Sequence, residues 1–186
     1  MKTSTTVFAF LTMFLAIGCA PKAGSAGKDL PPVRTVDKVD LSRYLGVWYE
    51  LAHYPFWAQK NCHCTTATYT LRPDGRISVL NQCYKGGCGG KLKSAHAVAW
   101  VVDQETNAKL KVRFFWPFTG DYWIIDLGKN YEYAVVGNPD RSYLWILSRT
   151  PELAPKVYEG ILKRIAEQGY DPARLVTSMQ KATNGK

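Results

Sequence analysis

The sequence predicts an all-β fold: an eight-stranded antiparallel up-and-down barrel with one amphipathic helix packed outside it. Eight short β-prone runs follow one another with turn residues between nearly all of them, and the apolar spacing then changes from alternating to helical. Closing such a sheet into a barrel removes both unpaired edges, and eight strands leave room for one small ligand. An open sandwich is the structural alternative.

The first residues have the pattern of an export signal. Lys2 precedes an apolar run at 7–18 that is too short to cross a bilayer of about 30 Å as a helix. The ending at 16–19 resembles the lipobox of bacterial lipoproteins, in which the cysteine, here Cys19, becomes the first mature residue and carries lipid. The resemblance implies a lipid-anchored protein. An ordinary signal peptide cleaved nearby is the alternative.

We expect one compact domain in the chain. Without the 18-residue signal, 168 of the 186 residues remain, which is enough to bury a substantial core. The segment after Cys19 is rich in small residues and proline, so it is predicted to behave as a flexible tether. The expected segments are the signal peptide at 1–18, the lipidated cysteine and tether at 19–35, the barrel with its helix at 36–180, and a disordered tail at 181–186.

The strands are predicted from alternation and from the turns between them. They are expected at 48–54, 66–71, 77–81, 96–102, 109–116, 122–127, 131–136 and 142–148. The hairpin after the second strand is the clearest, because Asp74-Gly75 tolerates the positive φ that the turn requires. Apolar residues at helical spacing then predict an amphipathic helix between Pro151 and Gly169, and a last short strand is expected within 174–179.

Four cysteines follow Cys19, namely Cys62, Cys64, Cys83 and Cys88, and in an oxidising compartment they predict two disulfides. Cys62 and Cys64 are expected about 7 Å apart on one strand face, too far to pair with each other. Counting across the hairpin favours Cys64–Cys83 with Cys62–Cys88, whereas a bulge would give Cys62–Cys83 with Cys64–Cys88. A zinc site that includes His63 is a rival interpretation, but the spacing lacks a Cys-x-x-Cys pair, and no metal is expected.

The composition of the sequence limits the classes of partner that the protein is expected to bind. The formal net charge is +9, but the lysines and arginines are scattered without a basic run, which is typical of a solvated surface; anionic lipid headgroups are the alternative partner. Export argues against a nucleic acid. Six Trp, eleven Tyr and seven Phe are more rings than a core of this size needs, and they indicate a site lined with aromatic side chains.

Three ordered motifs resemble those of the lipocalin family. They are the segment 41–51 with Gly46-x-Trp48, the pair Asn130-Tyr131, and the segment 138–149. The third closely resembles bacterial outer-membrane lipoprotein lipocalins of the Blc type, while Asn130 departs from the usual aspartate. The resemblance covers about 36–179 and implies a lipocalin calyx. It also implies a structural floor formed by Gly46, Trp48 and Arg149, with the arginine as a cation–π lid on the indole.

Ligand contacts are expected from inward strand faces above that floor. The predicted residues are Val98, Trp100, Phe114, Trp116, Tyr122, Tyr133, Tyr143 and Trp145. The orientation of the strand carrying Tyr122 is ambiguous, and for each residue packing in the lower core is the alternative role. Phe56 and Trp57 fall in the first long loop, which in lipocalins hangs over the mouth, so they are expected to form a lid or a membrane-facing edge.

The predicted function is a non-enzymatic carrier without a cofactor. It would bind a fatty acid or lysophospholipid in envelope lipid storage or transport, with the membrane as a partner through lipidated Cys19. The alternatives are an isomerase-like enzyme, a haem-binding lipocalin with His96 as axial ligand, and a protein-binding envelope lipoprotein. Ala20 after Cys19 favours the outer membrane, facing the periplasm, in a host with two membranes. The sequence leaves open whether two copies form a homodimer.

Overall fold

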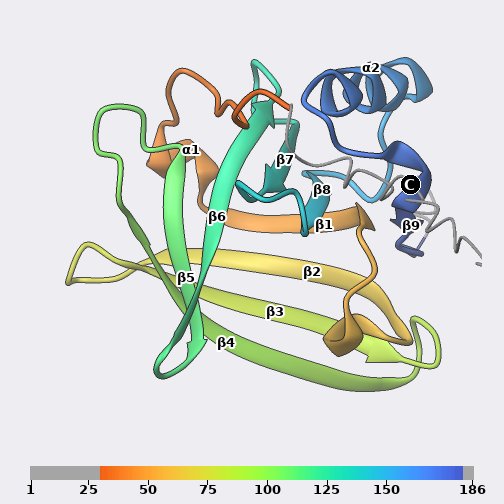
Figure 1. The fold of residues 1–186 in the computed structure, drawn as a ribbon. Helices are drawn as coiled ribbons and strands as arrows, with labels where there is room; N and C mark the ends of the chain where they lie inside the picture. The colour runs from red at the N-terminus through yellow and green to blue at the C-terminus, as the bar shows by residue number, and fades with distance from the viewer. Residues whose placement is uncertain (1–29, 182–186) are drawn as a thin grey trace, which may run out of the picture.

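The computed structural model describes residues 30–181, which form a closed antiparallel barrel (Figure 1). Strand β1 pairs with both β2 and β8, so the sheet closes on itself, and the open sandwich is ruled out. The strands are β1 (Gly46–His53), β2 (Cys62–Leu71), β3 (Ile77–Lys85), β4 (Lys91–Val101), β5 (Lys109–Phe115), β6 (Phe118–Leu127), β7 (Tyr133–Gly137), β8 (Leu144–Ser148) and β9 (Val176–Thr177). Eight strands form the predicted up-and-down barrel, and β9 adds to β1 outside that series.

The barrel has two distinct ends. Helix α1 (Leu41–Tyr44) precedes β1 at one end, called the closed end below, and begins at Asp40, whose carboxylate accepts a hydrogen bond from Ser42 N at 2.9 Å. The other end is the mouth. The connections at the mouth are 54–61, which contains the 3₁₀ turn η1 (Trp57–Gln59), then 86–90, 116–117 and 138–143.

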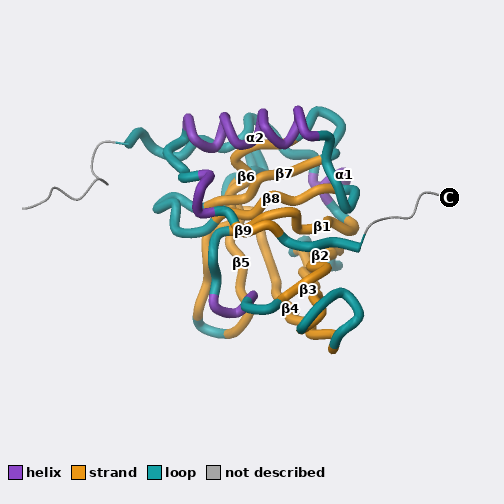
Figure 2. Tube along the Cα trace, turned by 90° about the vertical axis from the view of Figure 1, so that its right-hand side faces the viewer, coloured by secondary structure: helices purple, strands orange, loops and turns teal. Residues whose placement is uncertain are grey.

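Two hydrophobic cores lie on opposite sides of the same sheet. One fills the closed-end half of the barrel interior around Trp48, Ile77 and Leu110. The other lies between helix α2 (Pro155–Glu167) and the outer faces of the last strands, as the tube view shows (Figure 2). Ile161 and Ile165 of α2 are fully buried there. The predicted outer helix is therefore confirmed, with its first turn four residues later than Pro151.

The packed domain begins earlier than the sequence indicated. Val33 is only 6% exposed and belongs to the core beneath α2, and Arg34 N donates to Gln168 Oε1 at 2.8 Å. The tether prediction is therefore wrong for residues 30–35. The expected signal peptide, Cys19 with its lipid, and the tail from residue 182 lie outside the described residues.

Most strands extend further toward the mouth than the alternation predicted. Strand β2 starts four residues before the expected run, β4 starts five before it, and β3 ends four after it. On β4 the extra residues 91–95, which include Lys91 and Lys93, are all exposed, so both faces of the strand meet water there. An apolar pattern cannot mark a strand whose two faces are both wet.

A β-bulge decides the disulfide connectivity. Pairing between β2 and β3 shifts between His63 and Thr66, and Cys64 has φ 50°. The bonds are Cys62–Cys83 and Cys64–Cys88, with Cα–Cα distances of 5.4 and 5.3 Å. The favoured nested pattern is therefore wrong and the bulged alternative is confirmed. The zinc interpretation is also wrong, because all four thiols are oxidised in pairs.

The C-terminal segment completes the wall where β1 and β2 separate. These two strands pair only along the closed-end half, up to Tyr49 and Thr66. Nearer the mouth, Ser178 N donates to Leu51 O at 2.8 Å on β1, and Cys64 N donates to Met179 O at 2.7 Å on β2. The expected last short strand is thus confirmed as β9, and the residues after it join β1 to β2.

Candidate functional site

The floor of the barrel is built around one buried indole. Trp48 is fully buried, and its Nε1 donates to Tyr44 O at 2.8 Å. The guanidinium carbon of Arg149 lies 3.7 Å from the centroid of its ring, which is the predicted cation–π contact. Arg149 also donates to the carbonyls of Val47 and Arg43 at 2.8 and 2.6 Å.

Gly46 allows this approach of the arginine. It has φ +90°, which strains any residue with a side chain, and a Cβ there would lie 3.5 Å from Nη1 of Arg149. Residue 46 therefore has a left-handed backbone conformation and also lies close to the guanidinium of Arg149, and glycine suits both conditions. The three predicted floor residues therefore come together at the closed end.

Three tyrosine hydroxyls meet directly above the floor. Tyr122 Oη lies 2.7 Å from Tyr44 Oη and 2.9 Å from Tyr69 Oη. Burial raises the pKa of Tyr69 to about 12 and holds the pKa values of Tyr44 and Tyr122 well above their ordinary value. Three O–H groups make two mutual hydrogen bonds, so the trio keeps one donor for another oxygen. At neutral pH this is a polar, uncharged patch at the base of the interior.

The wall above the tyrosines is lined by small residues. Ala97 and Ala99 of β4 belong to the interior core and pair with Val79 and Ile77 of β3. The same alternation turns Ala95 inward. On β6, Gly120 is in register with inward-facing Val112, whose Cγ1 would lie 3.8 Å from a Cβ at the glycine.

The mouth half of the interior is open. Ala95 and Gly120 are exposed on the inward faces of β4 and β6, and at the level of Ala95 strand β4 no longer pairs with β5. Side chains of the closed-end half, such as Ala99 and Ile124, are buried. Tyr122 and Trp145 pack against the interior core but remain partly exposed. This inward surface, which is buried and apolar in its lower half and exposed near the mouth, is called the cup below.

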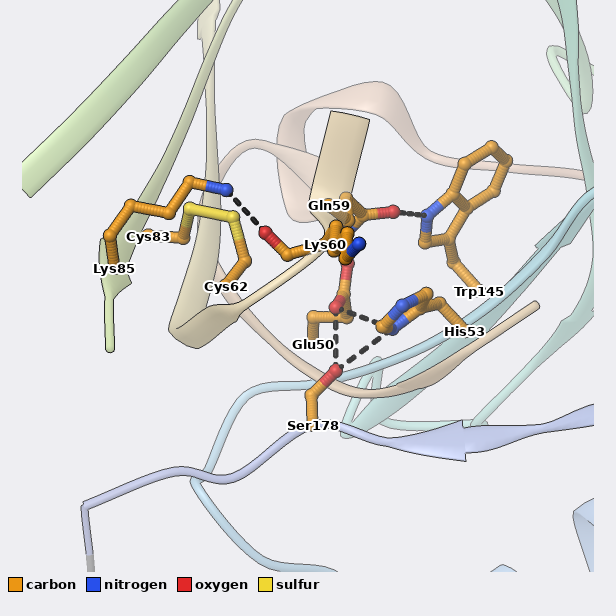
Figure 3. Close-up of a disulfide and its surroundings, with 9 residues drawn as sticks. All are labelled: Glu50, His53, Gln59, Lys60, Cys62, Cys83, Lys85, Trp145 and Ser178. Atoms are coloured by element: carbon orange, nitrogen blue, oxygen red, sulfur yellow. Dashed lines mark hydrogen bonds and ion pairs between the residues drawn. A yellow bond between two sulfur atoms is a disulfide. The ribbon is translucent and has the colours of Figure 1, made fainter. Parts of the chain in front are cut away.

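The first mouth loop is held to the inside of the cup by Gln59 (Figure 3). Its amide Nε2 donates to Glu50 Oε2 at 2.6 Å, and its Oε1 accepts from Trp145 Nε1 at 3.1 Å. Because Glu50 is on β1 and Trp145 is on β8, Gln59 ties the loop over that side of the opening. Phe56 lies edge-on to Tyr143, with 5.6 Å between the ring centroids.

A buried polar cluster joins β1 to the C-terminal segment. Ser178 Oγ donates to Glu50 Oε1 at 2.6 Å, and His53 Nδ1 lies 3.0 Å from Glu50 Oε1 and 3.1 Å from Ser178 Oγ (Figure 3). All three residues are buried. One imidazole nitrogen faces both oxygens, and the hydroxyl already donates to the carboxylate. This differs from a hydrolase triad, in which opposite imidazole nitrogens serve the nucleophile and the acid.

Several predicted contacts face away from the cup. Val98 and Trp100 alternate with the inward alanines of β4 and lie on the outer face, where Trp100 is 5.6 Å from the guanidinium of Arg113. His96 is exposed and shares this outward orientation. The predicted inward orientation is therefore wrong for these residues, and His96 does not offer an axial haem ligand inside the barrel.

Tyr133 is also turned outward. It belongs to the core beneath α2, where its hydroxyl accepts from Arg164 Nη2 at 2.9 Å and donates to Asp126 Oδ1 at 3.3 Å. The structure thus corrects its placement. The helix buries the outer face of β7, so apolar character there does not distinguish inside from outside.

The remaining predicted residues lie around the mouth. Trp116 is 80% exposed at the tip between β5 and β6, so its expected place inside the barrel is wrong. Phe114 is exposed beside the irregular register of β5, and Tyr143 is at the rim, stacked on Trp145. Trp57 is 82% exposed in the first mouth loop. Of the eight predicted ligand contacts, the structure places Tyr122 and Trp145 in the interior.

Sequence reasoning identifies Tyr122 but not its partners Tyr44 and Tyr69, nor the small wall residues and Glu50. The Ala-x-Ala-x-Ala pattern at 95–99 was an available signal, because an open interior needs small side chains on the inward face. The meeting of Tyr44, Tyr69 and Tyr122 has no local sequence signal, because these residues are far apart in the sequence and only folding brings them together.

Comparison with known proteins assigns the family. A lipocalin-like domain matches residues 39–180. The chain belongs to the lipocalin family. This lipocalin is 36% identical over 180 residues to the outer membrane lipoprotein Blc of Escherichia coli K12, covering 97% of this chain and 98% of that protein. It is 39% identical over 160 residues to temperature-induced lipocalin-1 of Arabidopsis thaliana, covering 81% and 84%.

Solved structures agree on the fold. Insecticyanin from the tobacco hornworm Manduca sexta superposes with a TM-score of 0.66 at 20% identity, covering 82% of this lipocalin and 87% of that chain. Within residues 30–181, none of the helices is long and apolar enough to cross a membrane. The same part of the chain holds no cluster of three or more His, Cys, Asp or Glu residues suited to a metal ion.

Proposed function

We propose that this lipocalin is a non-enzymatic carrier that holds a fatty acid or a lysophospholipid in its cup, as part of lipid storage or transport in the cell envelope. The observation that carries the proposal is the pair of inward-facing, solvent-accessible positions Ala95 and Gly120 above an apolar lower half. A hydrocarbon chain fits this gradient, because each buried methylene contributes about 0.8 kcal/mol before the ordering costs of binding.

The polar end of such a ligand belongs at the mouth. Lys91 and Lys93 are exposed at the mouth end of β4, where they can meet a carboxylate or a phosphate. Inside, Glu50 already engages Gln59 and Ser178, and its negative charge disfavours an anionic head at greater depth. In this proposal the hydrocarbon chain of the ligand runs along the alanine wall toward the tyrosine trio.

The absence of catalysis is part of the proposal. It is supported by the Glu50–His53–Ser178 geometry, in which the hydroxyl donates directly to the carboxylate, and by the disulfide bonding of the four cysteines of the domain. A carrier needs neither a nucleophile nor a general base.

We further propose that the protein is anchored by lipid on Cys19 to the outer membrane, facing the periplasm. The printed name of the E. coli relative describes an outer membrane lipoprotein, and that relative matches nearly the whole chain. Cell fractionation of the parent and a Cys19→Ser variant tests this part, because loss of the anchor should release the variant from the membrane fraction.

The binding proposal is tested by a fluorescence titration of delipidated protein with a fatty acid and a lysophospholipid, followed by native mass spectrometry of protein purified with its bound lipid. Saturable one-to-one binding with micromolar affinity is expected. A delipidated protein that takes up neither ligand would contradict the carrier function.

A further inference from the structure

We infer that the mouth of the barrel docks on an anionic phospholipid surface, so that the opening of the cup faces the bilayer. This inference rests on the proposed lipid-anchored carrier and names the surface that its site engages. The mouth surface consists of the rings of Trp57, Phe115, Trp116 and Phe118 and the lysines Lys60, Lys85, Lys91 and Lys93.

The rings of the mouth surface are exposed at two places, the first mouth loop and the end of the β5–β6 hairpin. Trp57 and Trp116 are 82% and 80% exposed, and Phe115 and Phe118 are also exposed, with 5.7 Å between their ring centroids. Large rings gathered at one end of a domain are costly in water, and aromatic side chains favour the interface between headgroups and acyl chains. Their common position at the mouth therefore fits insertion into a lipid surface.

Charge selects the kind of lipid. Three mouth segments, 54–61, 84–94 and 114–120, contain four lysines and neither aspartate nor glutamate, and the fourth, 138–143, contains one acid and one base, Asp140 and Arg141. Connections at the closed end carry both signs: Asp74 lies between Arg72 and Arg76, and Lys129 lies three residues before Glu132. The cationic excess is thus local to the end that carries the exposed rings, and lysines near a membrane are attracted to anionic headgroups.

The N-terminal part of the domain leaves from the same end. Arg141 in the mouth loop 138–143 donates to Pro31 O and, at 2.7 Å, to Gln168 O. Cys19 precedes Leu30 by eleven residues, a reach of at most about 40 Å. If the N-terminal segment left the domain at the closed end, it would need about 26 Å of that reach to pass along the eight residues of β1 to the mouth. Starting from the mouth end, an anchor on Cys19 keeps the rings and lysines beside the membrane.

The docked orientation gives the ligand a direct path. An amphiphile leaving the bilayer would enter between the hairpin tip at Trp116 and the first mouth loop at Trp57 without crossing water. The lysines would remain with the headgroups while the hydrocarbon chain moves onto the alanine wall.

Vesicle binding of the full chain tests the inference. All proteins carry Cys19→Ser, so that the proposed acyl chains are absent, and are sedimented with vesicles of dioleoylphosphatidylglycerol and dioleoylphosphatidylcholine. We expect Lys60→Glu/Lys91→Glu to reduce the partition coefficient at least tenfold, and Trp116→Ser to reduce it several-fold. The matched controls at the closed end and outer wall, Lys38→Glu/Lys129→Glu and Trp100→Ser, should change it less than twofold.

Two results would overturn the inference: a parent protein that does not bind the anionic vesicles, or equal losses in the mouth and control variants. Fatty-acid titration of the same variants without vesicles keeps the proposals apart. If ligand uptake persists while mouth and control variants bind vesicles alike, docking fails and the carrier stands. If uptake is absent while only the mouth variants lose vesicle binding, the carrier fails and docking stands.

Discussion

Ser178 and Glu50 are 128 residues apart in sequence, yet the serine hydroxyl donates to the glutamate carboxylate at 2.6 Å. This contact fastens the C-terminal segment to the inside of β1, at the level where β1 and β2 no longer pair. Gln180 strengthens the junction, since its Nε2 donates to Glu50 O at 2.7 Å and to Thr65 O at 3.0 Å. The barrel wall therefore depends on residues that follow the outer helix.

Replacement of Ser178 by alanine should lower the free energy of unfolding by about 1–3 kcal/mol, because a buried carboxylate loses a hydrogen-bond donor. Urea unfolding without reductant measures this. Ser94→Ala on the exposed part of β4 is the matched control and should change stability by less than about 0.5 kcal/mol. Equal effects of the two substitutions would contradict a structural role for the junction.

Removal of the indole should damage the floor more than removal of a tryptophan outside the barrel. Trp48→Ala should cost about 3–5 kcal/mol, because Trp48 is fully buried and also loses the Arg149 contact. Trp100→Ala, on the outer face, should cost clearly less. Thermal unfolding of both variants gives the comparison, and similar midpoints would show that the floor is not a stability determinant.

The tyrosine trio should make the fold sensitive to alkali. The pKa of Tyr69 is raised to about 12, whereas tyrosine in an unfolded chain ionises near pH 10. A raised folded-state pKa gives stability that is complete below about pH 10 and is lost as the pH rises toward 12. The free energy of unfolding should therefore fall across this interval.

Tyr69→Phe should make the free energy of unfolding fall less steeply with pH, since it removes one ionisable group whose protonation differs between the folded and unfolded states. Tyr143→Phe, at the rim, is the control. Urea unfolding at several pH values between 9 and 12 measures the slopes, and an unchanged slope in Tyr69→Phe would refute the contribution of this residue.

Neighbouring residues on opposite faces of β4 can test the cup directly. Ala95 faces inward and His96 outward, and both are exposed. Ala95→Trp should fill the open half and weaken fatty-acid binding at least tenfold, whereas His96→Trp should leave the affinity within about twofold. Fluorescence titration of a labelled fatty acid measures both, and thermal unfolding checks that each variant folds. Retained binding in a folded Ala95→Trp protein would place the ligand elsewhere.

Local signals allowed much of the fold to be predicted. The contact between Trp48 and Arg149 follows from two short motifs, and the outer helix follows from its apolar spacing. The prediction for β4 is wrong because it places the larger side chains, Val98 and Trp100, inward, whereas the interior face carries the alanines. The prediction for Tyr133 is wrong because α2 buries the outer face of β7 as deeply as the core buries the inner one.

Other features depend on contacts between distant parts of the chain. The bulge that sets the disulfide pairing contains Cys64, whose N–H donates to Met179 O in the C-terminal segment. The sequence of the hairpin alone does not reveal this contact, because Met179 is far from it along the chain. The tyrosine hydroxyls likewise come from α1, β2 and β6. These sites follow from closure of the barrel, which the sequence predicts as a topology without its detailed register.

The Cys62–Cys83 and Cys64–Cys88 bonds also order the events of maturation. Their formation removes four thiol hydrogens, and the cytosol keeps thiols reduced. A newly made chain in a reducing compartment therefore lacks both covalent ties between β2 and the region around the end of β3. The mouth therefore reaches the form described above only where an oxidant is present, and a chain kept in a reducing compartment would lack it.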